Sequence, residues 1–95
     1  MKWIEIIELR SAGTSCNLLE VQLKEFMEQL ANKSSKQMVK LYSRIMIDTS
    51  MSIHLYHNSS EVSHKGSSLG LKMASVLKSH GLVNHSIWIE KERII

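Results

Sequence analysis

Three side chains with complementary chemistry fall on neighbouring predicted strands: Glu5, Arg44 and His54. A carboxylate, a guanidinium and an imidazole that titrates near neutral pH can together orient an anionic or phenolic ligand. In an enzyme, His54 would accept a proton and Arg44 would stabilise the negative charge that develops. The same side chains could instead form an ion-pair network within an interface. We favour that role, because partly buried charges are most often paired for structural reasons.

The aromatic residues Trp3, Tyr42, Tyr56 and Trp88 form a second candidate group. These four side chains could enclose a flat organic ring and so act as ligand-binding residues. Aromatic residues are also enriched at the interfaces of oligomers, and an interface is the interpretation we favour.

The histidines raise the question of a metal site. His57 and His64 flank a long polar loop, which makes both candidate ligand-binding residues and makes His57 an alternative proton acceptor to His54. His54 and His57 point to opposite faces of one strand, and the spacings to His80 and His85 match no common set of metal ligands. We therefore predict no metal site and no tightly bound cofactor.

Period-two alternation predicts strands at 3–9, 37–47, 51–58 and 82–90. Helical spacing of apolar residues predicts one helix that begins near Asn17 and ends within 32–36, and another between Ser67 and Gly81. The segment 64–68 could bind an anion, but its expected role is to cap the second helix. Gly70 and Ala74 give that helix a strip of low relief where another element can approach closely.

The hydrophobic pattern also predicts how the two middle strands pair. A three-residue loop, 48–50, pairs Ile45 with Ile53 on one face and Arg44 with His54 on the other. The same register places Tyr42 opposite Tyr56, so an acid-base and aromatic cluster would form on one face of the hairpin.

These elements predict one domain, 1–95, with an α+β, ferredoxin-like βαββαβ fold. The antiparallel sheet has the order four, one, three, two, and both helices cover one face. The residues predicted to face the helices are Ile4, Ile6, Val39, Leu41, Ile45, Ile53, Leu55, Val83, Ile87 and Ile89. The residues predicted to lie on the uncovered face are Trp3, Glu5, Ile7, Tyr42, Arg44, Met46, His54, Tyr56, Ser86 and Trp88.

An uncovered sheet face with so many aromatic residues is typical of an interface or a ligand groove. In topology and face chemistry the whole chain resembles the dimeric α/β-barrel superfamily, which includes antibiotic-biosynthesis monooxygenases and stress-responsive barrel proteins. The resemblance implies a homodimer that packs sheet to sheet and binds small molecules between its sheet and its helices or loops. No motif of this chain transfers a catalytic residue from that superfamily.

The leading hypothesis is therefore a homodimer that binds a small aromatic or anionic molecule, in its enzymatic form a cofactor-independent monooxygenase or isomerase. The alternative is a non-catalytic dimerisation or sensing domain without a substrate pocket. The net charge of +3 is weak support for nucleic acid, and Glu5 and Glu90 on the uncovered face argue against it. With one cysteine, Cys16, and no long apolar span, we expect a cytoplasmic protein without membrane contact.

Overall fold

The structure is a computed structural model that describes residues 1–13, 16–31 and 38–95, with the backbone alone described at 29–31. Its elements are β1 (Lys2–Ser11), α1 (Asn17–Ala31), β2 (Met38–Arg44), β3 (Ile47–Asn58), α2 (Ser68–Leu77), a short 3-10 helix η1 (Lys78–His80) and β4 (Gly81–Ile89). The predicted helix end at 32–36 and the first residue of the second predicted strand, Gln37, lie outside the described residues.

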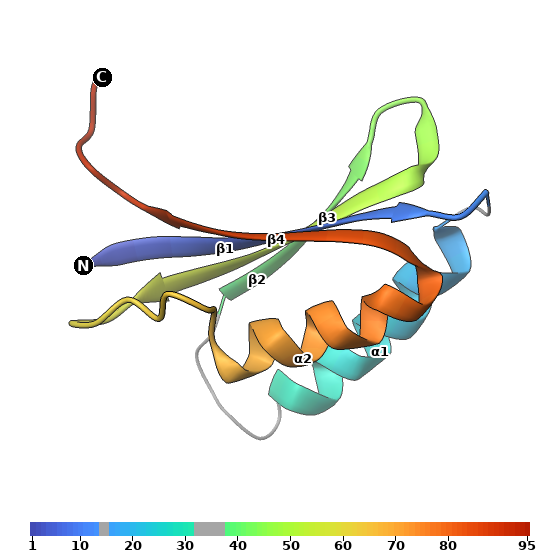
Figure 1. The fold of residues 1–95 in the computed structure, drawn as a ribbon, viewed down its shortest axis with the longest axis horizontal. Helices are drawn as coiled ribbons and strands as arrows, with labels where there is room; N and C mark the ends of the chain where they lie inside the picture. The colour runs from blue at the N-terminus through green and yellow to red at the C-terminus, as the bar shows by residue number, and fades with distance from the viewer. Residues whose placement is uncertain (14–15, 32–37) are drawn as a thin grey trace.

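The four strands form one antiparallel sheet in the order β2-β3-β1-β4, which is the predicted order read from the opposite edge. Both helices lie against the same side of this sheet (Figure 1). We call that side the helix face and the opposite side the open face. The chain thus has an α+β fold that is compatible with a ferredoxin-like topology.

The core lies between the helix face and the two helices. Ile53 and Leu55 of β3 are fully buried there, as predicted, and so are Met73 and Leu77 of α2. Leu23 of α1 belongs to the same cluster. Removal of this apolar surface from water is the main force that holds the helices on the sheet.

The predicted orientation of β1 is wrong. Trp3, Glu5 and Ile7 are buried on the helix face, and Ile4 and Ile6 lie on the open face. Both faces of this strand combine large apolar residues with an acid, so hydrophobicity alone could not choose between them. The actual orientation buries a tryptophan and satisfies the carboxylate of Glu5 with donors from distant segments.

The predicted hairpin register is also wrong. β2 and β3 are joined by a two-residue turn, Ile45–Met46, in which Met46 has a positive φ of 63°. Consequently Lys40 pairs with His54 and Tyr42 pairs with Ser52. From Met38 to Ser43 the observed register differs from the predicted one by four residues, and an even shift keeps side chains on the same faces. The register changes between Ser43 and Arg44, so that Arg44 pairs with Ile47 rather than with His54. The hydrophobic pattern therefore could not distinguish the two.

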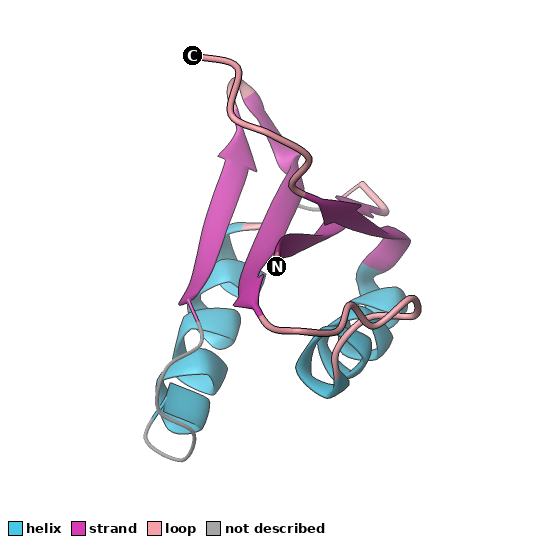
Figure 2. Cartoon of the chain, turned by 90° about the vertical axis from the view of Figure 1, so that its left-hand side faces the viewer, coloured by secondary structure: helices cyan, strands magenta, loops and turns pink. Residues whose placement is uncertain are grey.

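Two segments project from the sheet on the side away from the helices. One is the end of the β2–β3 hairpin, and the other is the C-terminal segment after β4; they rise at opposite ends of the sheet (Figure 1). From its start at the end of β4, the C-terminal segment crosses above the open face toward β2 (Figure 2). Within the described residues, no helix has both the length and the apolar character needed to cross a bilayer.

Candidate functional site

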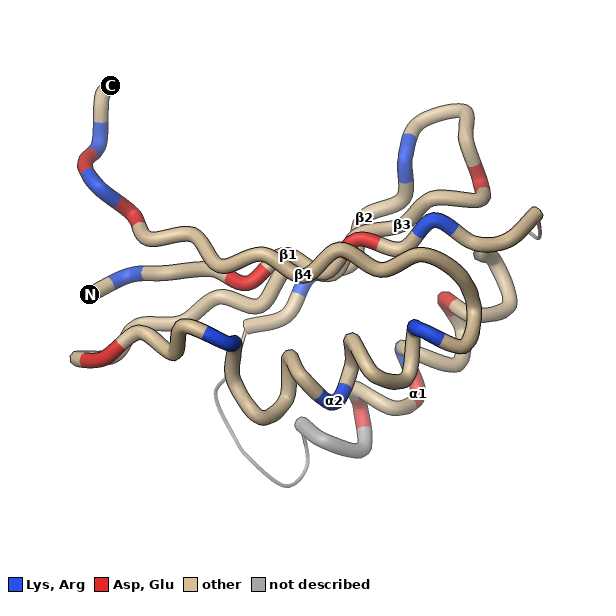
Figure 3. The backbone as a smooth tube through the Cα atoms, in the orientation of Figure 1, with Lys and Arg blue, Asp and Glu red and all other residues tan. Residues whose placement is uncertain are grey.

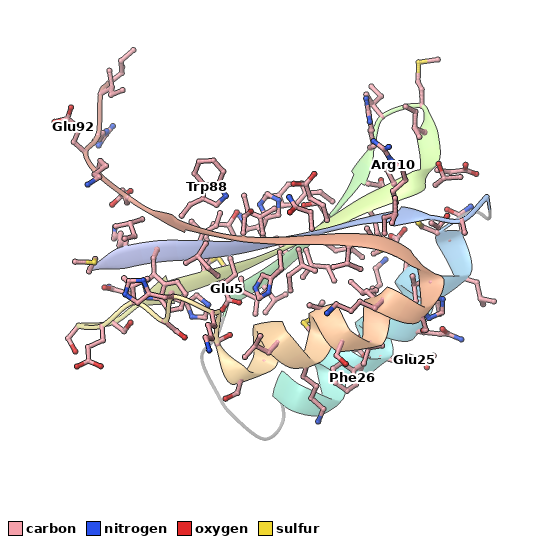
Figure 4. All side chains as sticks on the ribbon, viewed as in Figure 1. Glu5, Arg10, Glu25, Phe26, Trp88 and Glu92 are labelled. Carbon is pink, nitrogen blue, oxygen red and sulfur yellow. The ribbon has the colours of Figure 1, made fainter. Side chains whose placement is uncertain are left out.

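A fully buried carboxylate, Glu5, lies at the centre of the helix face. Its Oε1 accepts hydrogen bonds from His57 Nε2 at 2.7 Å and from the backbone N–H of Ser67 at 2.9 Å. Its Oε2 accepts one from His85 Nε2 at 2.7 Å. Figure 4 shows the side chain in the space between the sheet and the start of α2. One carboxylate thus joins β1, β3, β4 and the first turn of α2.

Two glycines allow this close approach. A Cβ atom at Gly66 would lie 2.8 Å from Glu5 Oε2 and 2.5 Å from His85 Cε1, and one at Gly70 would overlap the carboxylate. The backbone of Gly66 has a φ of 102°, which favours glycine. The expected low-relief strip on α2 is therefore occupied by a side chain of the central strand. Ser67 caps the helix as predicted, since its Oγ accepts from Gly70 N at 3.0 Å.

The pKa of Glu5 is lowered from its ordinary value of 4.5. Burial by itself raises the pKa, because it disfavours the charged form. Hydrogen bonds from Ser67, His85 and His57 outweigh burial, since they stabilise the carboxylate. The positive end of the α2 dipole acts in the same direction. Glu5 is therefore ionised at neutral pH despite having no contact with water.

Trp3 extends this cluster toward the loop after β3. Its ring stacks on His57 with a centroid separation of 3.9 Å and an interplanar angle of 17°. Its Nε1 donates to Ser59 Oγ at 2.9 Å. Every hydrogen-bonding group of Glu5 and Trp3 is thus used inside the chain, so the Glu5 cluster acts as an internal clamp between the sheet and the loop.

The open face carries a second arrangement, a groove of about 410 Å³ at the hairpin end of the sheet. Two arginines, Arg10 and Arg44, contribute to its lining, and Arg10 projects from the sheet toward the hairpin in Figure 4. Within the described residues neither arginine has an ion pair or side-chain partner. The other lining residues are Glu8, Leu9, Tyr42, Ser43, Ser50, Met51, Ser52, Leu82, Val83 and Asn84.

His54 lies next to this groove. Its Nε2 is 2.8 Å from Ser52 Oγ, and its ring centroid is 4.4 Å from that of Tyr42. Burial lowers the pKa of His54 from 6.5, and the negative charge of Glu8 partly opposes this shift. The imidazole is therefore mainly neutral at pH 7 and can accept a proton.

Aromatic residues surround His54 on the open face. The hydroxyls of Tyr42 and Tyr56 are 3.3 Å apart, and this hydrogen bond raises the pKa of Tyr56. Lys40 Nζ lies 5.4 Å from the centre of the Tyr56 ring, within the range of a cation–π contact. Trp88 projects from the same face and is 57% exposed. This part of the surface can therefore stack against a flat group.

The candidate residues from the sequence divide into two clusters on opposite faces. Trp3, Glu5 and His57 meet on the helix face, whereas Tyr42, Arg44, His54, Tyr56 and Trp88 lie on the open face or at its hairpin end. His64 is exposed in the turn before Gly66 and joins neither cluster. The predicted trio of Glu5, Arg44 and His54 therefore does not assemble.

Sequence reasoning missed His85 and Arg10. The alternation of the last predicted strand already placed His85 on the helix face. Its hydrogen bond to Glu5 could not be predicted, because Glu5 was expected on the opposite face. With Glu5 removed from the open face, Glu8 is the acid that β1 presents there. The prediction against nucleic acid therefore loses one of its two named acids, although an acid remains on the strand.

In the described part of the chain, no three His, Cys, Asp or Glu side chains are arranged to hold a metal ion. Comparison with known proteins gave no match to a family model, a curated protein or a solved structure.

Proposed function

We propose that this protein is a subunit of a homodimer, arranged as in a dimeric α/β barrel, that binds a small anionic organic molecule in the open-face groove. The observation that carries the proposal is a pair of arginines, Arg10 and Arg44, that have no ion pair within the described residues and lie in one groove beside a mainly neutral imidazole. Guanidinium groups bind carboxylates and phenolates through paired charge-assisted hydrogen bonds. Tyr42 and His54 offer flat surfaces for the ring of such a ligand.

In the enzymatic form of this proposal, His54 removes a proton from the bound ligand. Ser52 orients the imidazole through its contact with Nε2, and Arg44 stabilises the anion that forms. Return of the proton to another carbon would complete an isomerisation. Reaction of the anion with dioxygen would be the first step of a cofactor-independent oxygenation. The buried Glu5 cluster takes no part, because its donors and acceptors are already paired.

Binding is tested with salicylate, a flat organic anion, by isothermal titration calorimetry. Arg44→Gln removes a charge-assisted hydrogen bond and should weaken the affinity by about tenfold or more. Lys78→Gln is the matched control, since it removes one positive charge at an exposed position of η1 on the helix side. Equal affinity of both variants would contradict the assignment of the groove.

Catalysis is tested separately by turnover of quinol-type substrates under oxygen. The wild type should exceed His54→Ala, and the rate should fall as the pH drops through the lowered pKa of His54 because the protonated imidazole cannot accept a proton. If wild type and His54→Ala turn over substrate at equal rates, the proposed enzymatic role of His54 is wrong. The binding proposal is tested independently by the calorimetric titration.

The second candidate is a non-catalytic dimerisation or sensing domain. It is favoured by the large apolar side chains exposed on and around the open face, among them Trp88 and Leu82, which a partner could cover completely. A stable dimer that binds no organic anion and turns over no substrate would identify this candidate as the correct one.

A further inference from the structure

The two segments that project from the open face both end in apolar side chains. The hairpin tip, Ile45–Met46, has exposed fractions of 86% and 97%. The tail, residues 90–95, ends in Ile94 and Ile95, which are 88% and 100% exposed. Isolated exposed apolar residues are common, but here they form two clusters at opposite ends of one face (Figure 1).

The chain also exposes more surface than a compact monomer of its size. Its accessible area is 7159 Å². A typical monomer of 10.9 kDa exposes about 5,600 Å², so the excess is about 1,600 Å². A standard stable interface buries about 800 Å² on each partner. The excess over a compact monomer is therefore larger than the area that one partner buries in a standard interface.

We propose that, in the homodimer, the tip of each subunit packs against the tail of the other and that this tail closes the groove. The inference rests on the proposed function. Consider a twofold axis that lies between the two open faces, parallel to both sheets and perpendicular to their strands. Rotation about this axis packs the open faces together and exchanges the two ends of the sheet. It therefore places the tail of one copy beside the tip of the other at both ends, which makes two equivalent contacts.

Charge favours this axis over one that runs along the strands. An axis along the strands would bring tip to tip, with Arg44 of one copy facing Arg44 of the other. The tail instead carries alternating charges, Glu90, Lys91, Glu92 and Arg93, as Figure 3 shows. Opposite a partner's hairpin, its acids can approach Arg44, and its bases can approach Asp48. Complementary charges of this kind fix the register of an interface.

The position of the groove gives this contact a functional consequence. Arg10, Arg44 and Leu82 line the groove at the hairpin end of the sheet, where the partner's tail arrives. Leu82 is 75% exposed, so it is available to pack against Ile94 and Ile95 of the other copy. A ligand bound to the arginines would thus be shielded from water by the second subunit, and shielding strengthens its charge-assisted hydrogen bonds.

A pair of introduced cysteines tests the contact without any ligand. Met46→Cys and Ile94→Cys are both at exposed sites, whereas the native Cys16 is buried. A disulfide requires Cα atoms within about 7 Å, so oxidation should give a covalent dimer when the two single variants are mixed. Each single variant oxidised alone should form little covalent dimer. A dimer of Met46→Cys alone would indicate tip-to-tip packing and overturn the proposal, as would no cross-link in the mixture.

A matched control places the second cysteine on the far side of the molecule. Lys72→Cys lies at an exposed position of α2, so a mixture of Met46→Cys with Lys72→Cys should not cross-link above the level of random collision. Equal yields from this mixture and from the tip-and-tail mixture would contradict the proposed packing.

Removal of residues 91–95 tests both the contact and the closure of the groove. All five residues are exposed, so the fold should be retained, which circular dichroism can verify. Light scattering should show dimer dissociation at a concentration about tenfold higher or more. Salicylate should bind more weakly to the truncated chain than to the full one.

The results separate this inference from the proposed function. Cross-linking between tip and tail, with no salicylate binding by the full chain, would support the contact but overturn the function of the groove. Unchanged dimerisation of the truncated chain would overturn the contact, whatever the result of the salicylate titration. Unchanged salicylate affinity of the truncated chain would overturn the closure.

Discussion

Glu5→Gln is the substitution that tests the internal clamp most directly, because it keeps the shape of the side chain and removes its charge. The carboxylate accepts three hydrogen bonds, from His57, Ser67 and His85. A glutamine replaces one acceptor oxygen by a donor NH₂ group, which then faces either the N–H of Ser67 or the Nε2 atom of a histidine. The charge assistance of the hydrogen bonds is lost in every arrangement, and a buried donor is left without a partner unless the facing histidine moves its ring proton to Nδ1.

Loss of a hydrogen bond to a charged group costs about 1.5–3 kcal/mol, and a buried unsatisfied donor adds about 1–3 kcal/mol. Glutamine also removes the cost of burying a charge, which offsets part of this loss. We therefore expect a net destabilisation of about 2–4 kcal/mol. For a domain of this size, that corresponds to a melting temperature about 10–20 °C lower.

The assay is thermal and urea unfolding followed by circular dichroism at one protein concentration, since self-association would add to the apparent stability. Glu8→Gln is the matched control. It makes the same chemical change on the same strand, but at an exposed position that has no ion pair in the described part of the chain, so it should alter stability by less than about 0.5 kcal/mol. If both variants had the same melting temperature as the wild type, the hydrogen bonds of Glu5 would make no contribution to stability.

The stability lost in Glu5→Gln should depend on pH in a defined direction. The folded-state pKa of Glu5 lies below 4.5, so the folded protein binds the proton less readily than the unfolded chain. The stability contributed by the carboxylate is therefore complete above pH 4.5 and is lost as the pH falls through the folded-state value. The stability gap between wild type and Glu5→Gln should shrink in acid, and a gap that widened would refute the assigned ionisation.

Two further predictions concern the neighbours of these groups. Gly70→Ala should destabilise the protein by about 1–3 kcal/mol in urea unfolding, because its methyl group would overlap the carboxylate of Glu5. The destabilisation is expected even though alanine is more favourable than glycine in a helix by about 1 kcal/mol. The control is Ser75→Ala on the exposed side of α2, which should not destabilise the protein. In an NMR titration His54 should have a pKa below 6.5, and Glu8→Gln should lower that pKa further, since the negative charge of Glu8 raises it. A rise in Glu8→Gln would show that the two groups do not interact as described.

Local patterns predicted the elements well because they depend on neighbours along the chain. The alternation in β3 and β4, the helical spacing in α1 and α2 and the cap at Ser67 all correspond to described elements. The open-face positions of Tyr42, His54, Tyr56 and Trp88 also follow from alternation alone. The homodimer, the ligand and the catalytic roles of His54 and Arg44 stay predictions.

The orientation of β1 and the hairpin register could not be obtained in this way. In β1 the sequence offers two faces of similar hydrophobicity, and the choice depends on whether Glu5 finds donors. Those donors are 52, 62 and 80 residues away, so no local pattern reveals them. In the hairpin, Asp48 accepts a hydrogen bond from Cys16 N at 2.7 Å and belongs to β3 rather than to the turn.

Outside the tip of the β2–β3 hairpin, the sequence by itself thus determined which segments become strands and helices, and which residues of each strand share a face, because both depend on periodicity within a segment. At the tip, the predicted loop 48–50 belongs to β3 and the turn is Ile45–Met46. Only the tertiary structure decided which face of the central strand turns inward. The physical reason is that a buried carboxylate is acceptable only where several donors converge on it, and here they converge from β3, β4 and the start of α2. The same decision separated Glu5 from Arg44 and His54, so the internal clamp and the groove lie on opposite faces of one sheet.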